Sequence, residues 1–161
     1  MMTRMTASTF LDEIRTFLSE PGNQTPHGRY LGMDIVYLEH GRAVVRLPYA
    51  ETVAGNAESG VLHGGVITAA LDSACGIAVI AALGRRMGIA TLDLRIDYLK
   101  PATPGDAITA AAHCYKVTRN ICFVRALAYH ADSADPIANC TASFMITSAE
   151  PAGPRPSGEP G

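Results

Sequence analysis

One acidic side chain stands inside the most apolar stretch of this chain. Between Gly64 and Leu83 the sequence reads GGVITAALDSACGIAVIAAL, and Asp72 is its only charged residue. An ionised carboxylate is costly to bury unless it is paired or used, so its place among Ala, Val, Ile and Leu requires an explanation. We therefore take Asp72 as the leading catalytic candidate.

Two glycines open the same stretch, directly after His63. If the stretch is a helix, Gly64 and Gly65 lie at its N-terminus, where unpaired N–H groups and the positive end of the helix dipole favour an oxyanion. Glycine also allows a carbonyl group to approach the backbone closely. The pattern predicts an oxyanion site at one end of the helix, with His63 either bracing the loop before it or acting directly.

The spacing of these groups carries a further prediction. Gly64 and Asp72 are eight residues apart, which is roughly 12 Å along one helix. One carbonyl group cannot lie within about 3 Å of both an oxyanion donor and an attacking group that far apart. If both act on one substrate they come from different chains, so the spacing predicts a dimer with antiparallel helices.

The elements that position these residues follow from periodicity and turn chemistry. Apolar residues at helical spacing predict a short amphipathic helix over 9–18, and Pro26 to Arg29 is typical of a loop. Between Thr91 and Tyr98 every even position is apolar and every odd one polar, which predicts a strand with Thr91 on its polar face. The other expected strands cover 30–38, 42–49, 107–117, 121–131 and 137–147, with an irregular connection over 51–62.

This order of elements indicates an α+β fold, an antiparallel sheet of six strands with the long helix across one face. We expect one domain over 1–148, including an N-terminal helix within 1–20, and a disordered Pro/Gly-rich tail over 149–161. The helix face opposite Asp72 is expected to pack on the sheet; it carries Ile67, Ala70, Ala74, Ile77 and Ala81.

Composition excludes several function classes. The net charge is −2, without a basic block, so nothing favours nucleic acid or an anionic membrane surface. Residues 64–83 are long enough to span a bilayer, but Asp72, the opening glycines and the surrounding strands count against a span. The four cysteines lack metal or redox spacing and the N-terminus lacks an apolar signal, which indicates a reduced, cytoplasmic protein. No metal-ligand cluster, G-x-S-x-G elbow or phosphate-binding loop is present.

Two motifs carry a resemblance to a known family. Leu62 to Val66 reads LHGGV with an acid nine positions after the histidine, and Asp93 to Pro101 reads DLRIDYLKP. With this order of elements, residues 30–147 resemble the hotdog-fold acyl-CoA thioesterases of the phenylacetate-pathway (PaaI-like) branch. The resemblance implies a sheet wrapped around the central helix and hydrolysis of an acyl-CoA thioester at a site shared by two subunits.

Candidate catalytic residues are carried over by position. Asp72 matches the family's catalytic acid, acting as general base or as nucleophile, Gly64 its backbone donor to the thioester carbonyl, and Thr91 a hydroxyl that positions water. The family often has Asn six residues before the histidine. Here that position is Ala57 and Asn56 lies seven before, so Asn56 acts only if the loop carries an extra residue. His63 completes the catalytic candidates.

Candidate substrate-binding residues fall into two groups. Small residues near the glycines and Asp72 leave room for substrate, namely Gly65, Thr68 and Cys75, although core packing is the favoured role of Cys75 because burial raises a thiol pKa. Cations suited to the phosphates of coenzyme A are Arg85, Arg86, Lys100, Arg119 and Arg125. Coenzyme A is here part of the substrate, and no cofactor is expected.

Two other functions compete with hydrolysis. One is an acyl-CoA-binding hotdog regulator that does not hydrolyse, but the residues before Pro21 are too few for a helix-turn-helix module. The other is a hotdog hydratase or dehydratase, which requires a different arrangement of His and acid. The preferred acyl group does not follow from the sequence, and pairing of dimers into tetramers through a second sheet face is expected.

Overall fold

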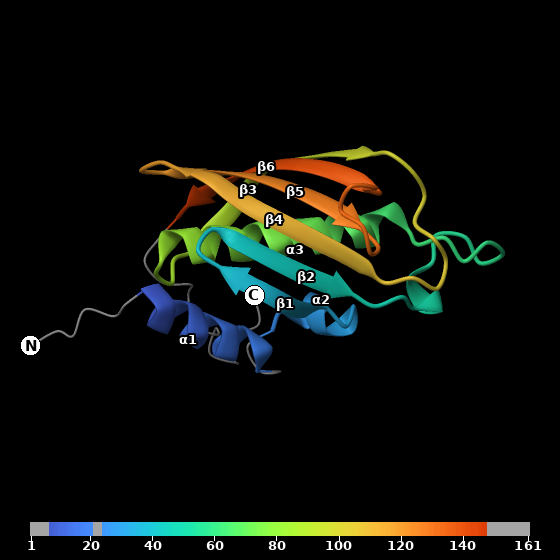
Figure 1. Ribbon diagram of the computed structural model, residues 1–161, viewed down its shortest axis with the longest axis horizontal. Coiled ribbons are helices and arrows are strands. Elements are labelled where there is room, and N and C mark those ends of the chain that lie inside the picture. The colour runs from blue at the N-terminus through green and yellow to red at the C-terminus, as the bar shows by residue number, and fades with distance from the viewer. Residues whose placement is uncertain (1–6, 21–23, 148–161) are drawn as a thin grey trace, which may run out of the picture.

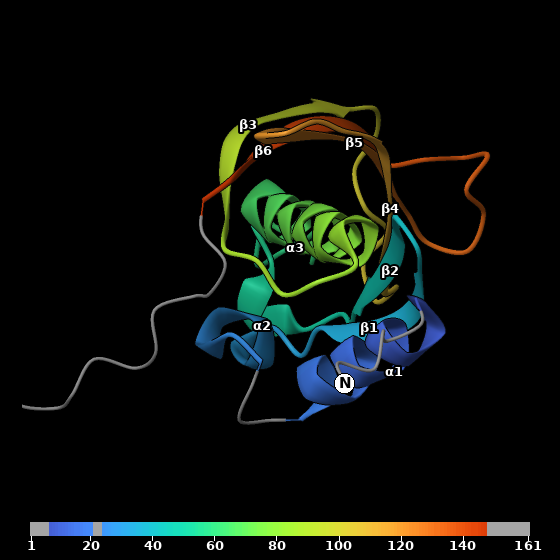
Figure 2. The same ribbon diagram turned by 90° about the vertical axis from the view of Figure 1, so that its left-hand side faces the viewer.

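The computed structural model describes residues 7–20 and 24–147, and its six strands form one antiparallel sheet. The strands are β1 (Asp34–Glu39), β2 (Arg42–Leu47), β3 (Ile89–Tyr98), β4 (Ile108–Val117), β5 (Ile121–Tyr129) and β6 (Ala138–Ile146), in the order β1-β2-β4-β5-β6-β3. The sheet curls around the long helix α3 (Gly64–Leu83), as Figure 1 and Figure 2 show. This confirms the α+β hotdog architecture; the predicted tail over 149–161 lies outside the described residues.

The other helical elements are short. Helix α1 (Ala7–Ser19) confirms the predicted amphipathic helix, burying Phe10 and Ile14, and it lies beside β1 in Figure 2. Residues 51–53 form a single 3-10 turn, η1 (Glu51–Val53), in the irregular connection.

The predicted loop at 26–29 is wrong, because Pro26–Tyr30 forms the short helix α2. Its first turn is held by Thr25, whose Oγ1 accepts a hydrogen bond from the Gly28 N–H at 3.1 Å. Proline fits the first helical position, since its missing N–H would lack a partner there anyway. The Pro and Gly that indicated a loop are therefore equally compatible with a helix start.

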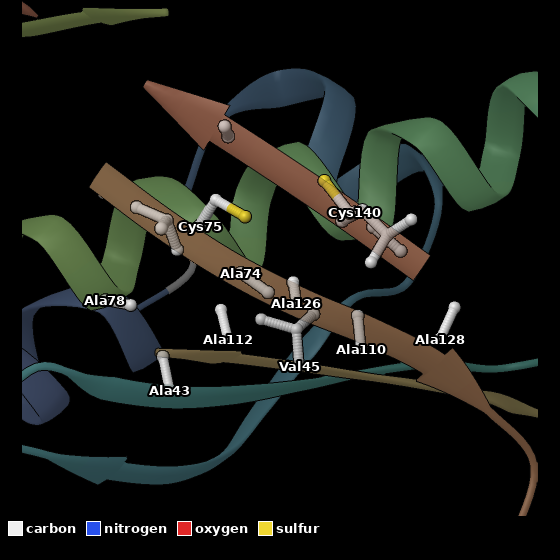
Figure 3. Close-up of a cluster of buried hydrophobic side chains, with 14 of the residues drawn as sticks. Ala43, Val45, Ala74, Cys75, Ala78, Ala110, Ala112, Ala126, Ala128 and Cys140 are labelled. Carbon is white, nitrogen blue, oxygen red and sulfur yellow. The ribbon is translucent and has the colours of Figure 1, made fainter. Parts of the chain in front are cut away.

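Helix α3 forms the core of the domain. It ends at Gly84, which adopts the left-handed conformation at φ +62° that favours glycine. Its sheet-facing side is buried, and Figure 3 shows the small side chains of Ala74 and Ala78 near the alanines of the strands. This position in the core accounts for a helix long and apolar enough to cross a membrane. The buried residues are Val66, Ile67, Ala70, Leu71, Ala74, Cys75, Ala78, Val79 and Ala81.

One residue of the predicted sheet-facing side is misplaced. Ile77 is only partly buried and lines a cavity together with Asp72. The cavity-facing residues of α3 are Asp72, Ser73, Gly76, Ile77 and Ile80. Their spacing of i, i+1, i+4, i+5 and i+8 defines one face of a helix. The buried side of α3 is therefore rotated away from Ile77 relative to the prediction, and it includes Leu71, Cys75 and Val79.

Strand β3 is an edge of the sheet and contains a bulge. It pairs with β6 from Thr91 opposite Phe144 to Asp93 opposite Ser143, so Leu92 is the extra residue. A bulge reverses the alternation of faces along a strand. The prediction that Thr91 lies on the outer face with Leu92 buried is therefore wrong: Leu92 is 50% exposed, and Thr91 contacts α3.

Candidate active site

A largely apolar cavity of about 360 Å³ lies beside Asp72. Its wall on α3 is the face described above, and Thr91 of β3 stands next to Asp72. The remaining lining consists of the apolar side chains of Leu18, Met33, Ile35, Val45, Ile89 and Phe144, of Gly28, and of the polar residues Gln24, Thr25 and Asp34. An apolar cavity with a few polar groups is the usual form of a small-molecule site.

Asp72 is partly buried and has one hydrogen-bond donor. The Thr91 hydroxyl donates to Asp72 Oδ1 at 3.0 Å. Neither ion pair between described side chains involves Asp72, so its charge is not neutralised by a lysine or arginine of the same described region. A carboxylate with one oriented oxygen and no counter-ion can accept a proton or attack an electrophile.

The start of α3 offers one backbone donor rather than two. His63 is the N-cap, and its Nδ1 accepts the Gly65 N–H at 2.9 Å. Gly64 is the first helical residue, and its N–H has no acceptor among residues 24–147. The geometry thus favours Gly64 over Gly65 as an oxyanion donor and gives His63 the bracing role.

Tyr98, which the sequence did not single out, also lies at this helix start. Its hydroxyl donates to the Gly64 carbonyl oxygen at 2.7 Å and lies 2.8 Å from Thr68 Oγ1. Thr68 in turn donates to the same carbonyl at 3.2 Å. The YLKP end of the strand contains the signal, but the alternation counts Tyr98 among the apolar positions and so predicts packing rather than a polar contact.

The predicted catalytic residues do not meet within one chain. Asp72 and Thr91 line the cavity, whereas Gly64 and His63 lie at the helix start and are not part of its wall. Asn56 is exposed in the loop before α3, where its Oδ1 accepts the N–H groups of Glu58 and Ser59 at 2.9 and 2.8 Å. The loop contacts therefore give Asn56 a structural role, and its catalytic role stays a prediction.

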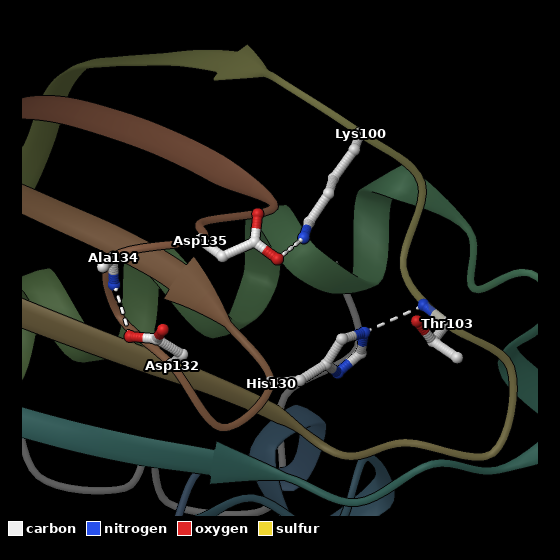
Figure 4. Close-up of polar contacts among 6 residues, drawn as sticks. All are labelled: Lys100, Thr103, His130, Asp132, Ala134 and Asp135. Atoms are coloured by element: carbon white, nitrogen blue, oxygen red, sulfur yellow. Dashed lines mark hydrogen bonds and ion pairs between the residues drawn. The ribbon is translucent and has the colours of Figure 1, made fainter.

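The predicted phosphate-binding cations are spread over the surface. Arg86 lies over the Phe17 ring at 3.9 Å, which joins it to α1. Lys100 forms an ion pair with Asp135, as Figure 4 shows. The same figure shows His130, the residue after β5, accepting the N–H of Thr103 in the loop after β3. Arg85 and Arg119 are exposed, and Arg125 stacks on Tyr115 at 4.7 Å. These cations do not gather in one place, so phosphate binding stays a prediction.

Cys75 lies in the core rather than in the cavity. It is fully buried and near Cys140 of β6, as Figure 3 shows. A hydrogen bond with Cys140, followed by burial, raises the pKa of the Cys75 thiol far above its ordinary value. A protonated, buried thiol is a poor nucleophile, so the packing role holds and the predicted substrate contact is not supported by its position.

The described residues contain no cluster of three His, Cys, Asp or Glu suited to a metal.

Comparisons with known proteins place the chain in a family. The family model described as thioesterase superfamily matches residues 59–137. The medium/long-chain acyl-CoA thioesterase YigI of Escherichia coli K12 is 30% identical over 134 residues, covering 75% of this chain and 85% of YigI. A crystal structure from Pseudomonas aeruginosa is 40% identical, with a TM-score of 0.73 over 86% of this chain and 99% of its own. The Escherichia coli PaaI protein from the phenylacetic acid degradation operon is 18% identical and shares the fold, with a TM-score of 0.76 over 88% of this chain and 98% of PaaI. This chain therefore belongs to the thioesterase superfamily.

Proposed function

We propose that this protein hydrolyses acyl-CoA thioesters with Asp72 as general base or nucleophile. The observation that carries the proposal is the Asp72 carboxylate, oriented by Thr91, in the wall of a largely apolar cavity. Membership of the thioesterase superfamily and similarity to a named acyl-CoA thioesterase support it.

Two routes lead from this arrangement to free acid and coenzyme A. In the first, Asp72 takes a proton from water, the water oxygen attacks the thioester carbonyl, and the C–S bond breaks as the thiolate leaves and is protonated. In the second, Asp72 attacks the carbonyl itself, coenzyme A leaves, and water hydrolyses the mixed anhydride. Both routes form an oxyanion, which the Gly64 N–H is suited to stabilise.

The oxyanion donor comes from a second copy of the chain in this proposal. Gly64 and Asp72 are separated by roughly 12 Å on one rigid helix, so a partner must bring its own Gly64 to Asp72. The ten-residue edge strand β3 supports such a dimer, because an unpaired edge is a template for pairing with another chain. Assembly of dimers into tetramers stays a prediction, as do a cytoplasmic location and independence from a cofactor.

We propose an aliphatic acyl group of medium length for the cavity. Its lining contains Leu, Ile, Val and Met side chains and a single aromatic one, Phe144. From Asp72 to Ile80 the cavity face of α3 extends over eight residues, roughly 12 Å, the length of an extended acyl chain of about nine or ten carbons. The medium/long-chain specificity in the name of YigI agrees with this choice.

Thiol release from a panel of acyl-CoA substrates tests the proposal. The wild type is expected to release thiol, and Asp72→Asn, which keeps the size of the side chain but cannot ionise, is expected to lose about 10²- to 10⁴-fold in kcat. Binding without release across the panel would instead identify a non-hydrolytic acyl-CoA-binding protein. Addition of water to an enoyl-CoA without thiol release would identify a hydratase.

A single turnover in ¹⁸O-labelled water tests for the nucleophilic route. If Asp72 is the nucleophile and water attacks the aspartyl side of the anhydride, ¹⁸O remains in Asp72, which mass spectrometry of the peptide detects. If Asp72 is a general base, or if water attacks the acyl side of the anhydride, the label enters only the released acid.

A further inference from the structure

We propose that Tyr98 is a positioning residue that fixes the direction of the Gly64 N–H toward the thioester oxygen. The inference rests on the proposed thioester hydrolysis and adds a residue from the far end of β3 to it. Tyr98 is about half exposed, and its hydroxyl contacts the Gly64 carbonyl at the start of α3.

One peptide group is held at both of its ends. The carbonyl of Gly64 accepts from the Tyr98 hydroxyl at 2.7 Å, and the N–H of Gly65, which belongs to the same planar group, donates to His63 Nδ1 at 2.9 Å. Because a peptide group is rigid and planar, two contacts on opposite ends fix its orientation. The N–H of Gly64 belongs to the preceding peptide group, whose His63 carbonyl accepts the Val66 N–H at 2.9 Å. The two groups meet at the Gly64 Cα, which is conformationally permissive, so holding the second group restricts the rotation that would turn the Gly64 N–H.

The neighbouring donors are all occupied. The His63 N–H donates to the Val53 carbonyl at 3.1 Å, the Gly65 N–H to the His63 ring, and the Val66 N–H to the His63 carbonyl at 2.9 Å. Among these four consecutive N–H groups, Gly64 alone has no acceptor in the described part of the chain. The local contacts therefore single out one donor and hold the backbone around it.

The close approach of Tyr98 also explains the glycine. A Cβ atom at position 64 would lie 3.3 Å from the Tyr98 hydroxyl oxygen and 3.4 Å from the ring carbon that bears it. Thr68 adds a second hydroxyl beside the same carbonyl, so the group is braced on its oxygen side by two side chains. On the inner face of β3, Thr91 therefore orients the carboxylate and Tyr98 the backbone donor.

Tyr98→Phe removes only the hydroxyl and is the primary test. We expect kcat to fall about 10- to 100-fold, with KM changed less than about twofold, because a misplaced oxyanion donor weakens the transition state more than the ground state. The matched control is Tyr37→Phe, which removes a hydroxyl bonded to Glu39 on an exposed strand and is expected to leave kcat unchanged. Equal kcat in wild type and Tyr98→Phe would overturn the proposal.

A pair of inhibitors separates positioning from a general structural role. A ketone analogue of acyl-CoA, with CH₂ in place of sulfur, presents a carbonyl to the donor, whereas a thioether analogue has no carbonyl. Tyr98→Phe is expected to weaken binding of the ketone analogue at least about fivefold more than binding of the thioether analogue. An equal loss of affinity for both analogues would show a general distortion of the site and would overturn the proposal.

The second contact on the Gly64–Gly65 peptide group, from the Gly65 N–H to His63, allows a rescue experiment. Asn at position 63 retains a side-chain acceptor for the Gly65 N–H, whereas Ala does not. His63→Asn is therefore expected to keep a higher kcat than His63→Ala. The reverse order would count against the proposal that these two contacts fix the peptide group. A wild type that releases no thiol would overturn the proposed function, whereas an active wild type matched by Tyr98→Phe would overturn only this inference.

Discussion

The Thr91 hydroxyl on β3 donates to Asp72 Oδ1 on α3 across 3.0 Å, and this contact exists because β3 bulges at Leu92. Without the extra residue, Thr91 would lie on the outer face of the sheet. The bond orients one carboxylate oxygen, and Oδ2 has no partner among the described residues. An edge-strand irregularity thus places the donor that orients the proposed catalytic acid.

Replacing Thr91 by Val removes this hydrogen bond with little change in shape. We expect kcat for acyl-CoA hydrolysis to fall about tenfold, since the carboxylate loses its orienting donor. Thr91→Ser retains the hydroxyl and is expected to keep most of the activity. Steady-state thiol release measures both variants, and a fully active Thr91→Val would show that the contact has no catalytic value.

A dimeric site predicts complementation between two inactive chains. Gly64→Pro removes the proposed donor N–H at the first helical position, where proline is tolerated, and His63 has the extended ψ of 132° that precedes proline well. A heterodimer of Gly64→Pro and Asp72→Asn chains, purified by two different tags, contains one intact site. We expect about half the wild-type activity, because two-fold symmetry gives two sites per dimer.

Gly64→Ala is the control for this experiment. It adds a Cβ atom against Tyr98 as proline does but keeps the N–H, so it is expected to retain more activity than Gly64→Pro. A heterodimer as inactive as both parents would place the complete site within one chain.

The cavity predicts that Ile80 limits acyl chain length. Ile80→Phe fills space at the end of the cavity wall on α3, so we expect kcat/KM for acyl chains of about ten carbons to fall at least about tenfold relative to those of about four. The ratio of the two kcat/KM values is the measurement. Val36→Phe, on an exposed position of β1, makes the same kind of change outside the cavity and should leave the ratio unaltered.

The buried thiol of Cys114 is expected to lower the stability of the protein at alkaline pH. Burial, with a contribution from nearby Cys122, raises the pKa of the Cys114 thiol to about 11. In the unfolded chain a thiol ionises at about pH 8.5. Below about that pH the Cys114 thiol is protonated in both the folded and the unfolded state, so its full contribution to the free energy of unfolding is present. Between the two values the unfolded state loses its proton first, and the free energy of unfolding falls by about 1.4 kcal/mol per pH unit.

Denaturant unfolding of wild type and Cys114→Ala between pH 8 and 11 checks this dependence. The wild type is expected to lose stability more steeply than the variant over this range, since the alanine has no proton to lose. Parallel curves would show that the thiol does not contribute.

The central helix was predictable from sequence because all its signals are local. Its apolar composition, the glycines after His63 and the terminal Gly84 define α3 to the residue. The spacing of Gly64 and Asp72 along a rigid helix is equally local, and it predicts a shared site without reference to tertiary contacts. The predicted strands over 107–117, 121–131 and 137–147 contain β4, β5 and β6, because turn signals between the segments are also local.

Only the tertiary structure decided which groups surround the helix. The bulge that turns Thr91 inward depends on the register between β3 and β6, which pairs residues about fifty positions apart in the chain. Tyr98 reaches Gly64 across thirty-four positions, and the cavity joins side chains of α1, β1, α3 and β3. Local sequence determines the propensity and the faces of an element, whereas register, bulges and cavities result from long-range packing, which no local pattern encodes.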